Sequence, residues 1–201
     1  MVNEKGWEVK RLGEVCDSFN YGTSSAADEN GKMKYLRMNN LTYEGEIILD
    51  NMKYINVDKE SYEKYVVRRG DILFNRTNSK ELVGKTALFN FDEEMIIAGY
   101  IIRIRVNNNT LHPQYATSYM NSPYMKAYLT TKAKGAVNQA NISAKELKLF
   151  PIPLPPLPLQ QSFAARIAAI DSQRERLAAS IRELETLLAC RMETLLNCPQ
   201  A

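Results

Sequence analysis

The most regular pattern of apolar and polar positions lies in the last quarter of the chain. A walk from Phe163 that steps alternately by four and three residues visits ten positions, eight apolar and two arginine. Residues 159–197 contain no proline or glycine, and a helix of that length extends about 58 Å at 1.5 Å per residue. A sustained 3.5-residue repeat with a charged outer face is typical of a coiled coil. We therefore predict a dimerisation and spacer helix over residues 159–201, with these seam positions: Phe163, Ile167, Ile170, Arg174, Leu177, Ile181, Leu184, Leu188, Arg191 and Leu195.

The first 150 residues carry short apolar runs that are separated by turn residues. The clearest strand pattern is the β-branched run over residues 100–106. A helical pattern covers residues 112–129 and is interrupted at Ser122-Pro123. Shorter strand candidates lie at residues 34–38, 46–49, 72–74, 86–89 and 95–98. Many short strands with few helices predict an α+β globular domain over residues 1–150, with mostly antiparallel strands.

A proline tract separates the two regular patterns, in the sequence Phe150-Pro-Ile-Pro-Leu-Pro-Pro-Leu-Pro158. Proline fixes one backbone dihedral and lacks the N–H that helices and sheets use. Residues 151–158 are therefore predicted to be a stiff, extended linker.

Composition places the chain among ordinary globular proteins, with 45% apolar and 24% charged residues and a net charge of +3. No apolar run reaches the roughly 18 residues of a membrane span. The N-terminus lacks the apolar core of a signal peptide. The three cysteines have no metal-like spacing. We expect a cytoplasmic protein with reduced thiols and no membrane association.

The distribution of charge is more informative than its total. Residues 95–145 contain six cations and no carboxylate. A stretch of one sign suits a phosphate backbone. It is equally explained by a solvated face whose acidic neighbours come from elsewhere in the fold. The six cations are Arg103, Arg105, Lys126, Lys132, Lys134 and Lys145.

Few residues offer catalytic chemistry. His112 is the single histidine, so a nucleophile–histidine pair is hard to assemble, and the scattered glycines form no phosphate-binding loop. Asn121-Ser-Pro-Tyr124 resembles the Asn-Pro-Pro-Tyr motif of amino-methyltransferases. It departs from that motif at its second position and lies within a helical pattern, so we interpret it as a helix break. Asp71 follows a glycine, so we interpret it as a turn residue.

Two polar, basic loops are better candidates for function. Asparagine and glutamine can pair with adenine edges in the major groove, and arginine and lysine read guanine or hold phosphates. We expect the lysines of these loops to act mainly on phosphates, and the amides and Arg76 to act on base edges. The same residues are also ordinary turn composition. The DNA-binding candidates are Asn75, Arg76, Thr77, Asn78, Ser79, Lys80 and Lys85 in the first region, and Lys132, Lys134, Asn138, Gln139 and Asn141 in the second.

The ordered set of short motifs resembles the specificity subunits of type I restriction-modification systems. The motifs are Trp7-x4-Leu12-Gly13, Arg69-Gly-Asp-Ile-Leu73, Gln139-Ala-Asn-Ile-Ser143, and the proline tract followed by Gln160-Gln161 and a long helix. In that family a target-recognition domain reads half of a split DNA site. A helix then acts as spacer and as docking surface for methyltransferase subunits. The usual subunit carries two domains and two helices, so this chain resembles a half-subunit.

The resemblance implies a subunit without catalytic residues or a cofactor of its own. S-adenosylmethionine, ATP and magnesium would bind only to partner subunits. The implied partners are double-stranded DNA, a second copy of this chain, methyltransferase subunits and restriction subunits. Two other interpretations stay open: a coiled-coil scaffold that does not bind DNA, and a small DNA methyltransferase or nuclease. The enzyme would need a cofactor loop or a carboxylate–metal cluster, and the sequence offers neither.

Overall fold

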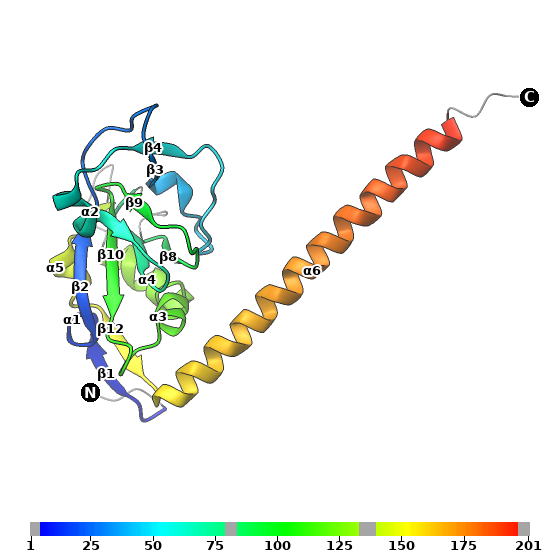
Figure 1. The fold of residues 1–201 in the computed structure, drawn as a ribbon. Helices are drawn as coiled ribbons and strands as arrows, with labels where there is room; N and C mark the ends of the chain where they lie inside the picture. The colour runs from blue at the N-terminus through cyan, green and yellow to red at the C-terminus, as the bar shows by residue number, and fades with distance from the viewer. Residues whose placement is uncertain (1–4, 79–83, 133–139, 197–201) are drawn as a thin grey trace, which may run out of the picture. The chain divides into compact units, whose positions relative to one another are not determined.

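The computed structural model describes residues 5–78, 84–132 and 140–196 (Figure 1). The chain forms two compact units, Met1–Gln161 and Ser162–Ala201. The first unit is a mixed α+β domain and the second consists of helix, so the predicted fold class is confirmed.

The first unit is built around an antiparallel sheet of four strands in the order β2-β10-β6-β8 (Figure 1). Its longest central strand is β10, the predicted β-branched run, whose apolar side chains are buried. The strands are β2 (Cys16–Tyr21), β6 (Ile72–Asn75), β8 (Thr86–Leu88) and β10 (Ile101–Val106).

A second sheet of four strands has the order β4-β3-β9-β5. The pair β3–β9 is parallel, and the other two pairs are antiparallel. The strands are β3 (Met33–Leu36), β4 (Lys53–Ile55), β5 (Val66–Val67) and β9 (Met95–Ile97). Its short helical neighbours are a 3-10 turn, η1 (Met38–Asn40), and α2 (Lys59–Tyr65).

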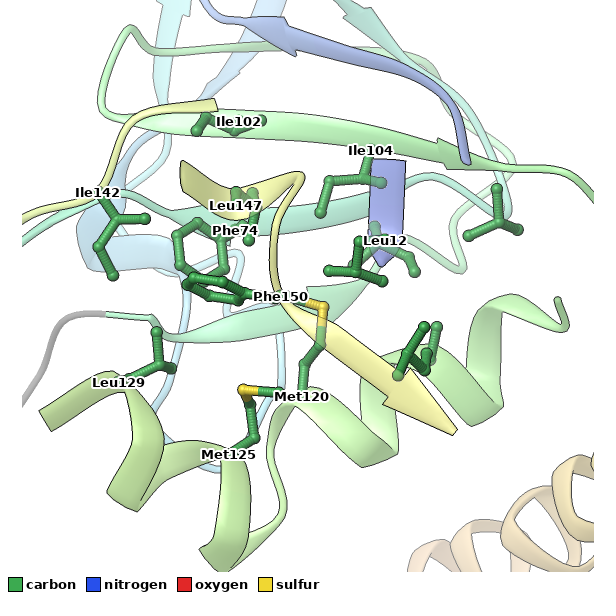
Figure 2. Packing of buried hydrophobic residues seen from close by; sticks show 14 of the residues in the cluster. Leu12, Phe74, Ile102, Ile104, Met120, Met125, Leu129, Ile142, Leu147 and Phe150 are labelled. Carbon is green, nitrogen blue, oxygen red and sulfur yellow. The ribbon is translucent and has the colours of Figure 1, made fainter. Parts of the chain in front are cut away.

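The main hydrophobic core lies between the first sheet and the helices α3 (Pro113–Met120) and α4 (Pro123–Lys132) (Figure 2). The ring of Phe150 packs edge-on against Phe74, with centroids 6.4 Å apart, and against Tyr128 at 5.4 Å. Full burial of side chains of this size contributes roughly 1.5–3 kcal/mol each.

The predicted helix break is confirmed, because α3 ends at Met120 and α4 begins at Pro123. Asn121 donates its side-chain amide to the carbonyl oxygen of Thr86 at 2.7 Å. Tyr124 is 64% exposed. The tetrapeptide therefore joins two helices, and its asparagine is committed to the neighbouring strand.

The proline tract differs from the predicted linker. Residues Pro151–Leu154 form strand β12, which pairs antiparallel with β1 (Glu8–Arg11). The helix α1 (Leu12–Val15) follows β1 directly. Prolines are tolerated here because a strand in a two-stranded ribbon has one edge without a hydrogen-bonded neighbour. The tract is thus part of the folded domain.

The second unit is the helix α6 (Leu157–Leu196), whose first turn belongs to the first unit. Its 40 residues span about 60 Å. It begins two residues before the predicted start, because Pro158 fits the first turn of a helix, where the N–H has no partner. The side chain of Leu195 is outside the described part. Six seam residues of this helix are large, apolar and at least one-third exposed: Phe163, Ile170, Leu177, Ile181, Leu184 and Leu188.

None of the described helices is both long and apolar enough to cross a membrane.

Candidate nucleic-acid interface

The structure brings the two predicted polar loops together. Strand β7 (Thr77–Asn78) pairs antiparallel with β11 (Ala140–Asn141). The hydroxyl of Thr77 donates to the side-chain oxygen of Asn141 at 3.1 Å, across 64 residues of sequence. The backbone of Ile142 adds a hydrogen bond of 2.8 Å to the carbonyl of Arg76. One small ribbon therefore carries residues from both loops.

The predicted residues divide into three groups. Asn75 and Thr77 are buried, and Lys85 donates to the carbonyl of Leu41 at 3.0 Å, so these three serve the fold. Arg76 is half-buried and Asn141 is exposed. The side chains of Asn78, Ser79, Lys80, Lys132, Lys134, Asn138 and Gln139 lie outside the described residues. The DNA-reading role of the whole set stays a prediction.

Arg76 is held between β6 and β7 by packing on an aromatic ring. Its guanidinium carbon lies 4.8 Å from the centroid of the Tyr21 ring. The hydroxyl of Tyr21 accepts a hydrogen bond of 2.7 Å from the backbone of Ala144, at the start of helix α5 (Ala144–Leu147). The Arg76 backbone N–H donates to the carbonyl of Tyr100 at 2.9 Å. These contacts fix the position of the Arg76 guanidinium group.

A cleft of about 680 Å³ lies beside Arg76. Among the described residues that line it, Arg37 and Arg76 are charged and none is a carboxylate. The lining residues are Thr23, Ser24, Ser25, Ala26, Ala27, Tyr35, Arg37, Met38, Asn39, Arg76, Ala98, Gly99 and Tyr100.

Sequence reasoning missed Arg37. It lies within the predicted strand at residues 34–38, 39 positions before Arg76 in the chain. No local motif links the two arginines, so only the packing of the two sheets could reveal that they share a cleft.

One wall of the cleft depends on a close approach of two backbones. The backbone of Thr23 donates to the carbonyl of Ile97 at 2.9 Å and accepts from Gly99 at 2.7 Å. A β-carbon at Gly22 would lie 2.2 Å from the carbonyl oxygen of Ile97, so only glycine fits there.

Tyr35 holds the loop that follows Gly22, at residues 23–25. Its hydroxyl lies 3.1 Å and 3.0 Å from the carbonyl oxygens of Thr23 and Ser25. Burial raises the pKa of Tyr35, which keeps this hydroxyl protonated as a donor.

Much of the basic charge in the sequence is committed to ion pairs. Arg68 pairs with Glu63 and Glu94, and a hydrogen bond from Arg68 lowers the pKa of Glu63. Arg69 pairs with Asp92 at 2.9 Å, and Arg105 with Asp71 at 2.8 Å. Acidic residues from elsewhere in the chain therefore neutralise the charge of these arginines. The charge pattern alone is weak evidence for DNA.

Two further cations of the carboxylate-free stretch are turned inward. Arg103 is buried and donates to the carbonyl of Val66 and to the side chain of Asn20. Lys126 lies 4.2 Å from the centroid of the Tyr43 ring and donates to the carbonyl of Gly84 at 3.2 Å. Neither is available as a free phosphate ligand.

Asp71 is structural, and its replacement should be costly. It accepts two hydrogen bonds from Arg105 and one from the backbone of Arg68 while almost fully buried. Asp71→Ala should lower the free energy of unfolding by about 2–4 kcal/mol, because it leaves a half-buried guanidinium unpaired. Urea unfolding measures this, with Asp92→Ala as matched control, since Asp92 is a fully exposed ion-pair partner whose loss should change the free energy of unfolding little. Equal losses in the two variants would contradict the assignment.

Lys126 should make stability depend on pH. Burial lowers its pKa from 10.5 to about 8. Between these values the unfolded chain binds more protons, so stability rises with pH. Relative to Lys126→Met, the wild type should gain about 1–2 kcal/mol from pH 7.5 to 10, after allowance for partial solvent exposure. Urea unfolding at both pH values tests this. Lys126→Arg should show no gain, because arginine stays charged; an equal gain in that variant would contradict the burial effect.

Catalytic sites are not evident in the described residues. They contain no group of three or more histidine, cysteine, aspartate or glutamate residues that could hold a metal ion. His112 caps α3, accepting a hydrogen bond of 3.2 Å from the backbone of Gln114, as its place before Pro113 predicts.

The α+β domain carries a cleft lined by two arginines, and a long helix follows it in the chain. The family model for the type I restriction modification DNA specificity domain matches residues 4–186. The chain therefore belongs to that family. Its members are specificity subunits, a non-catalytic class, which confirms the expectation that this chain is not an enzyme.

Among relatives, the putative type I restriction enzyme MjaX specificity subunit of Methanocaldococcus jannaschii is 29% identical over 170 residues. The match covers 83% of this chain and 40% of that protein. The EcoEI specificity subunit of Escherichia coli is 28% identical over 165 residues, covering 77% of this chain and 27% of that protein. The chain thus spans less than half of the length of these relatives.

Solved structures share the fold. The HsdS subunit from Thermoanaerobacter tengcongensis has a TM-score of 0.60 and 22% identity over 96% of this chain and 46% of that chain. The type I restriction-modification S subunit from M. genitalium has a TM-score of 0.62 and 16% identity, covering 97% of this chain and 47% of that chain. At these identities the likeness concerns the fold alone.

Proposed function

We propose that this chain is a DNA-recognition subunit that reads one half of a bipartite site within a type I restriction-modification complex. The observation that carries the proposal is the family match, which runs through the α+β domain and most of α6. The relatives are specificity subunits of type I restriction enzymes. One half of the site is assigned to the one α+β domain that the described residues form.

The reading surface is centred on the β7–β11 ribbon. The lysines of both loops act on phosphates, whose negative charge dominates affinity for DNA. The amides act on base edges. The proposed DNA-binding set is the one that the sequence predicts, less the buried Asn75 and Thr77 and less Lys85, whose side chain donates to the carbonyl of Leu41.

Helix α6 pairs with the same helix of a second copy. Its exposed apolar seam supports this, because a stripe of leucine and isoleucine is unfavourable in water. A two-fold pair presents the reading surface twice, and the helix length sets the spacer between two inverted half-sites. The paired helices also dock methyltransferase subunits. Those partners supply S-adenosylmethionine chemistry and any ATP- and magnesium-dependent cleavage.

Selection from a randomised duplex library tests the function. The full chain at low salt, with and without methyltransferase subunits, should enrich two inverted half-sites separated by a fixed spacer. Asn78→Ala should relax preference at one base pair, at roughly 1–3 kcal/mol. A chain that enriches no sequence in either form, and whose retention on DNA does not depend on salt, would instead be a coiled-coil scaffold.

A further inference from the structure

The cleft beside Arg76 has the composition of an anion site. The thirteen described residues that line it include two arginines and neither a carboxylate nor a lysine. This is unusual within the domain, where Arg68, Arg69 and Arg105 all face carboxylates. A cleft lined by one sign of charge concentrates the opposite sign.

Both arginines have a donor that the described protein leaves unused. The Nε atoms of Arg37 and Arg76 have no hydrogen-bond acceptor among the described residues, and neither has that of Arg103 outside the cleft. These Nε atoms are themselves buried, so a ligand in the cleft would contact the other nitrogens of each guanidinium. Buried donors are normally paired. Arg37 is anchored by a bond of 2.9 Å from Nη2 to the carbonyl of Asn51, and Arg76 by the ring of Tyr21. Each guanidinium is therefore held in place, while its Nε–H makes no hydrogen bond within the described protein.

The third side of the cleft is a hydroxyl-rich turn. Thr23 donates its hydroxyl to that of Ser25 at 2.9 Å and accepts from the Ser25 backbone at 3.1 Å. Ser24 lines the cleft between them. Hydroxyl groups commonly donate to phosphate oxygens beside arginines.

We propose that this cleft binds a phosphodiester of the DNA backbone, held between Arg37 and Arg76, with the hydroxyl groups of Ser24 and Ser25 as further donors. The cleft volume of about 680 Å³ exceeds what an inorganic ion needs and admits the sugars on either side. Arg76 leads directly into β7, so the backbone of a strand read at the β7–β11 ribbon would cross the cleft. The assignment rests on the proposed function.

This gives Arg76 a different role from the one that the sequence predicts. A base-reading arginine needs its guanidinium edge free to reach guanine in the major groove. Here the guanidinium lies on Tyr21 and faces a cleft that it shares with a second arginine. Two arginines around one anion fit a phosphate, whose oxygens accept from several directions.

The salt dependence of DNA binding tests the proposal. The full chain is titrated with two labelled duplexes of unrelated sequence between 50 and 200 mM salt. Loss of one phosphate contact lowers the slope of log K against log salt by about 0.9. Arg37→Ala should therefore lower the slope by about that amount on both duplexes, so wild-type binding falls roughly threefold more than variant binding over this range. Arg37→Lys should keep most of the slope, because it keeps the charge.

Arg69→Ala is the matched control, because it removes the same charge from an exposed arginine outside the cleft. It should leave the slope nearly unchanged, and thermal melting should show that all variants are folded. Equal slopes for wild type and Arg37→Ala would overturn the phosphate site while the proposed function stands. An Arg76→Ala loss confined to one of the two duplexes would overturn it in favour of base reading. A wild type that binds neither duplex would overturn the proposed function and this site with it.

Discussion

Replacing Leu177 and Leu184 together with glutamate is expected to convert a dimer into monomers. Both side chains lie on the seam of α6 and are 64% and 65% exposed in the single chain. In a paired helix they would be buried, and unpaired carboxylates there are strongly unfavourable. A loss of roughly 4 kcal/mol or more is expected, which is about a thousandfold in the dissociation constant. Sedimentation equilibrium across the micromolar range measures this change.

The control places the same two charges on another face of the same helix. Ala179 and Thr186 are also seven residues apart and exposed, but they stand two positions after the seam leucines. The pair Ala179→Glu and Thr186→Glu should leave the dimer intact. A wild type that sediments as a monomer at tens of micromolar would refute the homodimer. Equal dissociation of both double variants would show that added charge, not the seam, is responsible.

The elements that the sequence predicts well are those whose pattern is self-contained. Strand β10 is a six-residue run of β-branched residues and arginines, and α6 continues one period over 40 residues. Such a pattern predicts the same secondary structure whatever other parts of the protein pack against it. The capping box at Ser143 and Glu146 was predictable for the same reason, because both of its hydrogen bonds are local.

Elements that depend on distant partners were not predictable. Strand β2 has the polar sequence Cys-Asp-Ser-Phe-Asn-Tyr and is a strand because it pairs with β10. The apolar run at residues 46–49, predicted as a strand, makes only a single bridge, Leu41 to Ile47. Residues 151–154 became a strand because β1 offers them an edge. Strand propensity is decided by such neighbours as much as by composition.

The candidate site shows the same division. Loop composition identified Arg76 and Asn141, and the pairing of β7 with β11 joins their loops. Arg105 is not free to bind DNA, because it pairs with Asp71, 34 residues earlier in the chain. The sequence alone could not reveal this ion pair. Arg37 reached the cleft through the packing of two sheets. Counting charges along the sequence therefore overestimated the number of cations available to DNA and missed Arg37.

Gln160→Leu is expected to destabilise the junction between the α+β domain and the start of α6. Gln160 is 1% exposed and belongs to the first compact unit. Its amide donates to the carbonyls of Thr110 at 3.1 Å and Pro155 at 2.8 Å, and its oxygen accepts from the backbone of His112 at 2.8 Å. Leucine has a similar volume but pairs with none of these. One buried and two partly buried backbone groups lose their partner, so the free energy of unfolding should fall by about 2–4 kcal/mol.

Gln161 is the natural control, because it is the next residue and is exposed. Gln161→Leu should change the free energy of unfolding by no more than about 0.5 kcal/mol. Urea unfolding followed by the fluorescence of Trp7 in the domain compares the two variants. Because the helix sets the spacer in the proposed function, a loosened first turn should also broaden the spacer lengths that Gln160→Leu selects from the randomised library. Equal stability of the two variants would show that the hydrogen bonds of Gln160 are replaced by water, and the junction would then owe its stability to the β1–β12 ribbon alone.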